Sequence, residues 1–490
     1  MLAALLCAAA APPPAAAAPP PMPGAVPHVE YDGMQRLHYE FGPIAIAPGQ
    51  NTIEFAPTQL KPPVPGYITR FEPNLVRTDG TVPPVDELHL HHGVWLMRGQ
   101  PTFGAGEEKT IFQFPRGFGY RYEPRDDWLV NHMIHNLLPG RDSVYLTYDV
   151  DFVPADAPAA AALREVKPLW LDVAGIKAYP VFDVKRGWGG RDGRYTFPDE
   201  AATAAQRSRI GPAHRFTAPG DMTLVWAAGH LHPGGISTNL SVRRAGGARR
   251  AIFRSDAKYW EPAGAVSWDV ALTATRPGWR VKVRRGDELR LSATYDARRA
   301  AWYESMGIDM VFYADGHDAG GTDPFAERVD PSGTPTHGHL PENDNHGGRP
   351  IGLPDARRLL AGPLASTVSI RDFVYGRGDL TGSGLFGRPP AVRAGQSLRF
   401  RNADAPRNVW HTITACRAPC NRSTGIAYPL ADGRAQFDSG QLGFGLEGFT
   451  AAANRDTWRT PRNLRAGTYT FFCRVHPFMR GAFRVKGRRR

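Results

Sequence analysis

The chain has 490 residues, a formal net charge of +12, 42% hydrophobic and 22% charged residues. Its 53 glycines and 45 prolines exclude a mainly helical protein and favour a loop-rich, all-β chain of about two to four domains. No apolar run is long enough to cross a bilayer. The basic residues are scattered without an aromatic-interleaved basic helix, which excludes a typical nucleic-acid-binding protein.

Residues 1–27 predict an export leader. An apolar run from Met1 to Ala11 continues into a Pro/Ala-rich spacer, although no positive residue precedes the run. The spacing of Cys416 and Cys420 predicts a disulfide, which needs an oxidising compartment. We therefore expect an extracytoplasmic protein, secreted, periplasmic or bound to the cell envelope, that is a monomer with no integral membrane segment.

Short alternating runs bounded by proline and glycine predict strands through most of the remaining chain. An Ala/Pro-rich stretch and a later stretch rich in Gly, Pro, Asp and His divide these strands into blocks. The predicted units are a β-sandwich at 28–162, a second β-sandwich at 163–321, a linker at 322–364 and a third all-β unit at 365–487.

The third unit contains the clearest motif of the chain. Cys473, His476 and Met479 follow a predicted strand, and His411 lies on a strand well upstream. Two imidazoles, a thiolate and a weak axial thioether are the donors of a type 1 copper centre. Cys473 is also the odd thiol once Cys416 and Cys420 pair, since Cys7 belongs to the leader.

These ligands resemble those of the cupredoxin (plastocyanin-like) family, and 437–440 resembles that family's loop before its last strands. The resemblance covers 366–485 and implies a Greek-key β-sandwich that transfers electrons. Because His476 lies in a loop, we expect its ring to be the exposed edge through which electrons pass.

Histidines are also concentrated in the first block. His89, His91 and His92 precede an apolar stretch, and His132 and His135 lie on a later apolar strand. Side chains alternate across a strand, so His89 and His91 share a face and His92 joins them only at a bulge or strand end. Two such strands meeting would form a three-imidazole metal site.

The second block contains His230 and His232 at the end of a strand, with both rings on one face as a natural chelate. Met306 follows later, and a methionine on its own is normally a core residue. Two imidazoles and a thioether stabilise Cu(I) and leave a coordination position open for dioxygen.

The order of these groups across two adjacent sandwiches resembles the copper type II ascorbate-dependent monooxygenases, which include peptidylglycine hydroxylating and dopamine beta-monooxygenases. The turn at 114–120 resembles a turn of that family. The resemblance covers 28–321 and implies two jelly-roll-like sandwiches with two type 2-like coppers. An electron-transfer copper would bind His91, His92 and His135, with His89 or His132 as alternatives; a catalytic copper would bind His230, His232 and Met306.

The sequence departs from that family's pattern in two ways. One departure argues against a peptidylglycine substrate, and the other shows that the family's framework disulfides are missing. Ala228 and Met310 stand where the peptide hydroxylase holds its substrate with arginine and tyrosine, and 28–321 contains no cysteine. The sequence therefore predicts a copper monooxygenase that hydroxylates a C–H bond of a small molecule, with ascorbate or a redox protein as external donor.

Two other functions remain open. The chain would alternatively be a non-catalytic electron-transfer or copper-handling protein, or a carbohydrate- or envelope-binding module fused to a cupredoxin. His337, His339 and His346 would form a further metal site or belong to a solvated linker. The acidic and basic run 107–109 predicts a surface or turn cluster.

Overall fold

The computed structural model describes residues 21–175, 180–244, 246–261, 264–265, 268–298, 302–344, 354–381, 388–416, 420, 437–444 and 455–487. Most of the predicted leader and His346 lie outside the described residues. The described part of the chain is built almost entirely of strands, with one short α-helix, α1 (Ala204–Arg207), which confirms the all-β prediction. We find no helix in these ranges with the length and apolar character needed to span a bilayer.

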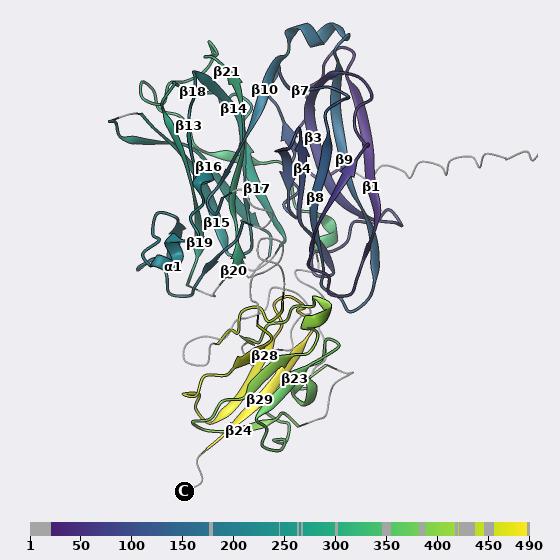
Figure 1. Cartoon of the computed structure of the whole chain (residues 1–490), viewed down its shortest axis with the longest axis vertical. Coiled ribbons are helices and arrows are strands. Elements are labelled where there is room, and N and C mark those ends of the chain that lie inside the picture. The colour runs from purple at the N-terminus through teal and green to yellow at the C-terminus, as the bar shows by residue number, and fades with distance from the viewer. Residues whose placement is uncertain are drawn as a thin grey trace, which may run out of the picture.

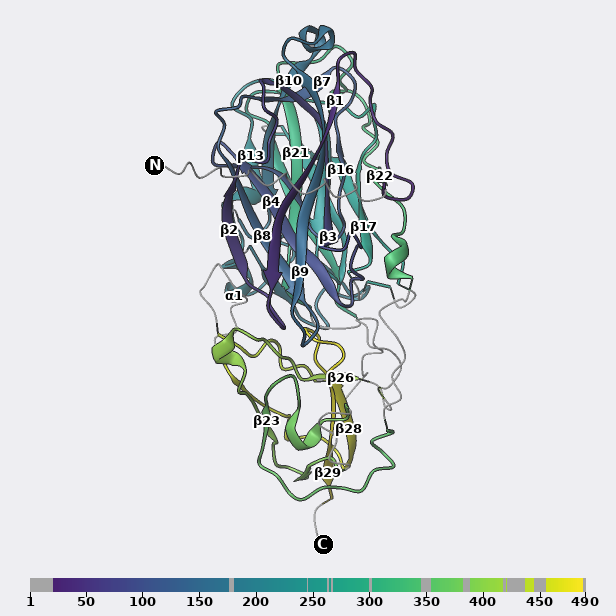
Figure 2. The ribbon, with the colours of Figure 1, turned by 90° about the vertical axis from the view of Figure 1, so that its right-hand side faces the viewer.

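The described strands form three β units. Two sandwiches stand side by side, and a smaller unit formed by the C-terminal part of the chain lies against one end of the pair (Figure 1). A view turned by a quarter shows the same small unit below both sandwiches (Figure 2).

The first sandwich encloses an aromatic core between two sheets. Phe71 of one sheet packs on Trp95 and Phe103 of the other, with ring centroids 4.8 and 4.4 Å apart. One sheet has the order β2 (Ile53–Thr58), β8 (Trp128–Asn136), β4 (Leu88–Met97) and β5 (Gln100–Ala105). The other contains β1 (Gln35–Ile46), β9 (Asp142–Pro154), β3 (Gly66–Arg77), β6 (Phe112–Gln113) and β7 (Phe118–Tyr122).

The sheet that contains β1, β9, β3 and β7 continues into the second sandwich through one strand, β10 (Arg164–Asp172). This strand pairs parallel with β7 and antiparallel with β21 (Gly307–Asp315). From β21 the order is β14 (Met222–Leu231), β17 (Val270–Thr275), β16 (Arg249–Tyr259), β15 (Gly235–Arg243), β19 (Glu288–Asp296) and β12 (Arg194–Phe197). Shorter strands complete it: β13 (Arg215–Thr217), β18 (Val281–Val283), β22 (Gly333–Pro335), and the pair β11 (Phe182–Val184) and β20 (Trp302–Ser305).

The C-terminal unit is formed by two small sheets. One contains β23 (Thr367–Ile370), β25 (Arg399–Asn402) and β27 (Thr457–Arg459). The other contains β24 (Ala391–Arg393), β29 (Arg480–Lys486), β28 (Gly467–Phe472) and β26 (Thr414–Cys416). The predicted disulfide between Cys416 and Cys420 follows β26.

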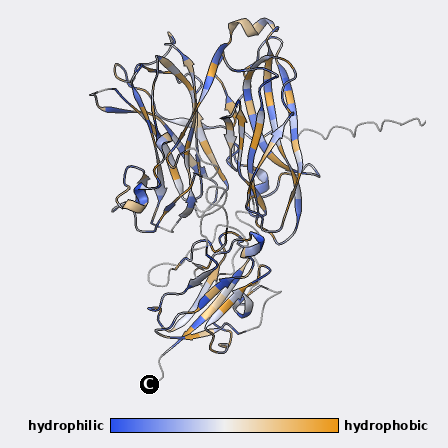
Figure 3. Cartoon of the chain, viewed as in Figure 1, coloured by the Kyte–Doolittle hydropathy of each residue, from blue (hydrophilic) through white to orange (hydrophobic). Residues whose placement is uncertain are grey.

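Hydrophobic and polar residues alternate along many strands, so that one face of each packs into a core and the other meets solvent (Figure 3). The strand β14 is an exception because it is buried along its whole length. Its last residues, and the turn after it, contain two of the histidines that the sequence singles out.

The acid group of Asp309 is fully buried in β21 beside β14 and accepts a hydrogen bond from Thr238. Burial raises its pKa from 3.8 to about 8. Because the folded-state pKa is the higher one, this group stabilises the fold below about pH 4 and loses that contribution as pH rises to about 8.

We therefore expect the free energy of unfolding of Asp309→Asn, measured with urea, to depend less on pH than that of the natural protein. The difference should be about 1.4 kcal/mol per pH unit between about pH 4 and pH 8. Asp256→Asn, at a partly exposed position on β16, serves as the matched control. Parallel pH profiles for Asp309→Asn and the natural protein would contradict the assignment.

Candidate metal centres

Three side chains of the C-terminal unit meet at one point. The ligand atoms of His411, Cys473 and His476 all lie within 4.8 Å of one another, and all three residues are buried. Cys473 Sγ lies 3.9 Å from His411 Nδ1 and 3.8 Å from His476 Nδ1. Within the described ranges, no other three His, Cys, Asp or Glu side chains converge in this way.

A buried carboxylate orients His411 from the other side of its ring. Asp404 Oδ2 lies 3.0 Å from His411 Nε2, which leaves Nδ1 directed at the thiol. Although burial disfavours the charged form, hydrogen bonds from His411, the Asp372 N–H and Arg407 hold the pKa of Asp404 at about 2. A carboxylate behind an imidazole fixes both the tautomer and the ring of a metal ligand.

The thiol of Cys473 is prepared as a thiolate. Burial raises its pKa, but contact with His411 and two backbone N–H donors bring the pKa below its usual value. The N–H groups of Thr412 and His476 each donate to Sγ at 3.3 Å. A thiolate, not a thiol, is the metal-binding form of cysteine.

The fourth predicted ligand, Met479, is fully buried at the end of the same loop. Its backbone closes the loop, since Met479 N–H donates to His476 O and Cys473 N–H donates to Met479 O. His411 lies just before β26, on an isolated bridge to Leu442 rather than on a strand. The predicted loop at 437–440 braces this segment: Ile413 N–H donates to Ser439 Oγ at 2.8 Å.

The ring of His476 is not an exposed edge, so that prediction is wrong. His476 is fully buried because the C-terminal unit packs its metal-binding loop against the first sandwich. Gly49 allows this close approach: its backbone has a left-handed φ of 61°, and a Cβ there would lie 2.9 Å from His476 Nε2 and 2.8 Å from Phe373. On the same side, His476 faces His135, with ring centroids 6.1 Å apart.

The histidines of the first sandwich are spread along the paired strands β4 and β8 and do not gather at one point. A bulge between Leu90 and His92 shifts the register of β4 against β8, which is one of the two irregularities, a bulge or a strand end, that the sequence leaves open for His92. His89 pairs with His135 across the two strands, at a ring distance of 4.9 Å. His92 instead lies beside Asn131, Nε2 to Oδ1 3.2 Å.

Other ring contacts of this group cross to the second sandwich. His91 approaches His232, with ring centroids 4.4 Å apart, and lies 5.8 Å from His92. His132 is buried on β8 and packs against Phe41. The copper site of His91, His92 and His135 therefore stays a prediction, with ligands that face different neighbours in the described structure.

His230 and His232 are held as a metal chelate would require. His230 Nδ1 lies 2.9 Å from the buried carboxylate of Glu108, and His232 Nδ1–H donates to the Glu304 carbonyl. The Nε2 atoms of both rings are buried and have no hydrogen-bond partner among the described residues. In both rings Nδ1 is anchored by an oxygen atom and Nε2 has no partner among the described residues. This arrangement fits two imidazoles that bind a metal ion through Nε2.

The third predicted ligand of this centre is braced by Tyr295. The phenol oxygen accepts hydrogen bonds from Met306 N–H at 3.0 Å and from His232 N–H at 3.3 Å, and it donates to Met306 O at 2.5 Å. One buried side chain thus fixes the backbones of both predicted ligands relative to each other.

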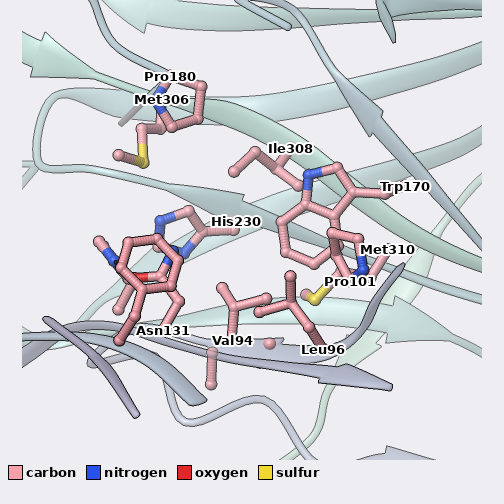
Figure 4. A pocket seen from close by; sticks show the side chains of 14 residues that line it. Val94, Leu96, Pro101, Asn131, Trp170, Pro180, His230, Met306, Ile308 and Met310 are labelled. Carbon is pink, nitrogen blue, oxygen red and sulfur yellow. Dashed lines mark hydrogen bonds between the residues drawn. The ribbon is translucent and has the colours of Figure 1, made fainter. Parts of the chain in front are cut away.

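A cavity of about 290 Å³ opens beside this centre, between the two sandwiches. His92, Asn131, His230 and Met306 line one end of it. The remaining wall is almost entirely apolar (Figure 4); it includes Val94, Leu96, Trp170, Ile308 and Met310.

The run 107–109 forms a turn, one of the two alternatives that the sequence leaves open, but it is not a surface cluster, because Glu107, Glu108 and Lys109 are all buried. Lys109 pairs with Glu107 at 3.0 Å, and Glu107 also accepts from Leu90 N–H at 2.8 Å. Burial of such a run is possible because each charge has a partner. Glu108 lies behind His230, a role that sequence spacing gives no reason to expect.

Two histidines of the predicted linker lie against the sandwiches. His337 is buried, with Nε2 2.6 Å from the Glu108 carbonyl. His339 Nε2 lies 3.0 Å from the Asp269 carboxylate. These contacts give each of the two a protein partner instead of a shared metal position.

No protein-family model and no curated protein matches the chain. Among solved structures, a purple cupredoxin from Nitrosopumilus maritimus is similar at 18% identity over 25% of this chain and 99% of that chain, with a TM-score of 0.17. A Cu-containing nitrite reductase from Thermus scotoductus is similar at 14% identity over 55% of this chain and 58% of that chain, TM-score 0.16. At these TM-scores the two likenesses do not assign a function to this chain.

Proposed function

We propose that the chain is an extracytoplasmic copper redox protein whose C-terminal unit transfers single electrons. The observation that carries this proposal is the buried convergence of His411, Cys473 and His476 within 4.8 Å. Two imidazoles and a thiolate, with Met479 buried in the same loop, match the donor preference of a copper ion that cycles between Cu(I) and Cu(II). The disulfide between Cys416 and Cys420 supports an oxidising compartment.

We further propose that the two sandwiches form a monooxygenase, in which His230, His232 and Met306 would hold a copper ion next to a bound substrate. The anchored His230 and His232, whose buried Nε2 atoms have no hydrogen-bond partner among the described residues, support metal binding. The cavity lined by Val94 and Met310 supports a small apolar substrate whose C–H bond is hydroxylated. Copper bound there would supply dioxygen chemistry that no side chain supplies.

The cavity offers a direct test. Val94 lines the cavity and is not itself a proposed ligand. Val94→Phe reduces the space in this cavity, so we expect substrate-dependent oxygen consumption to fall by about tenfold or more for the larger substrates of an apolar panel. Copper content should remain unchanged. Val64→Phe, at an exposed position with 41% of its surface accessible, is the matched control.

Two results would count against the oxygenase proposal. The first is the absence of substrate-dependent oxygen consumption in fully copper-loaded natural protein supplied with ascorbate. The second is equal activity of Val94→Phe and Val64→Phe across the panel. A protein that loads copper but shows the first result would be an electron-transfer or copper-handling protein.

A further inference from the structure

Five aromatic rings connect the two proposed copper centres without a break. From His476 the ring centroids are 6.1 Å to His135, then 4.9 Å to His89, 4.5 Å to Trp268 and 4.9 Å to His232. The first ring belongs to the C-terminal unit, the next two to the first sandwich and the last two to the second. We infer that this chain of rings is an internal electron relay, with Trp268 as the link between the sandwiches.

The burial of the first step supports an internal route. His476 is fully buried and His135 is only 6% exposed, so the contact between them is closed to an external redox protein. The docking that creates the contact depends on Gly49, which lies against both His476 and Phe373. Arg474 adds a second contact, with its guanidinium 5.5 Å from the ring centroid of Trp302 in the second sandwich.

Trp268 lies where three histidines converge. Its ring stacks on His89 at an angle of 25° and also lies 5.1 Å from His91. The route that bypasses it runs from His89 to His91, a step of 6.3 Å, before reaching His232 at 4.4 Å. Electron tunnelling weakens steeply with each gap between packed atoms, so the route through the indole, whose longer step is 4.9 Å, is favoured.

The relay rests on the proposed function, because it needs copper at both ends. One electron would leave the copper held at Cys473, and that copper would be oxidised from Cu(I) to Cu(II). The electron would reach the copper held at His230 and His232, and that copper would be reduced from Cu(II) to Cu(I). No bond forms or breaks and no proton moves. A small reductant such as ascorbate supplies the electron to the Cys473 centre.

The experiment measures this transfer directly in the full-length, copper-loaded protein. A pulse of radiolytic reductant reduces the Cys473 centre, and the recovery of its visible absorption reports the electron leaving. We expect first-order recovery whose rate is independent of protein concentration. In Trp268→Leu the transfer rate should fall by about tenfold, because the smaller side chain leaves part of the space between the rings of His89 and His232 empty. Trp268→Phe, which keeps an aromatic ring at this position, should retain most of the natural rate.

Two further variants complete the design. Trp260→Leu is the matched control, since Trp260 packs against His339, outside the relay, and its loss should not change the rate. Gly49→Val should slow the transfer by separating the docked units, because any Cβ there collides with Phe373 and His476. Copper content and resonance spectra of each variant show that both centres are present.

The outcomes separate the two proposals. A natural protein without a visible copper band, or without a second copper, overturns the proposed function. A natural protein with both coppers, whose recovery rate scales with protein concentration, overturns the relay alone. Equal rates in Trp268→Leu and Trp260→Leu also overturn it.

Discussion

Cys473→Ser is expected to abolish the intense visible absorption of the copper-loaded protein and its type 1 resonance. The thiolate is the ligand that produces both signals, and a hydroxyl is neither soft nor ionised at neutral pH. The structure predicts that this variant folds, because the introduced hydroxyl can still accept from the Thr412 and His476 N–H groups that now donate to Sγ. Copper content should fall by about one ion per chain.

The control for this variant is the double substitution of Cys416 and Cys420 by serine. It removes the disulfide, which closes a short loop after β26, but leaves all four proposed ligands. We expect the visible band to persist there. A visible band that survives in Cys473→Ser, or one that disappears in the disulfide variant while the fold is intact, would contradict the assignment.

The second large effect is expected from replacing both His230 and His232 with alanine. This variant loses the two rings at the end of β14 whose buried Nε2 atoms lack partners among the described residues, so we expect the loss of a type 2 copper signal. Oxygen consumption should fall by on the order of a hundredfold or more, while the visible band of the Cys473 centre remains. The measurement is copper analysis with electron paramagnetic resonance, followed by oxygen electrode assays.

His317→Ala provides the comparison within the same sandwich. His317 is partly exposed and lies beyond β21, where its ring approaches the Val283 carbonyl at 3.3 Å. It should keep both copper signals and full activity. Retention of the type 2 signal in the His230/His232 double variant would show that the second copper binds elsewhere.

The convergence of His411, Cys473 and His476 could be predicted largely from local patterns. Cys473, His476 and Met479 lie close together after β28, so the chain itself brings them near one another, and only His411 must be supplied by a distant segment. The all-β fold follows in the same way, because alternation and frequent turns are properties of single segments. The sequence left open a bulge or a strand end beside His92, and the structure shows a bulge between Leu90 and His92.

The arrangement of the histidines between the units was not readable from the sequence. It depends on which sheets face each other and on how the C-terminal unit docks, and both are set by packing between segments far apart in the chain. Trp268 and Glu108 acquire their roles only from that packing. His476 changes from an expected exposed edge to a buried contact for the same reason, since Gly49 admits it against the first sandwich.

The central claim is that one chain holds a type 1 copper at Cys473 and a separate copper at His230 and His232. Electron paramagnetic resonance with total copper analysis, on natural protein loaded with copper, tests it most directly. We predict one type 1 signal together with at least one type 2 signal, the first lost in Cys473→Ser and the second lost in the His230/His232 double variant. A single copper per chain, all of it type 1, would contradict the claim.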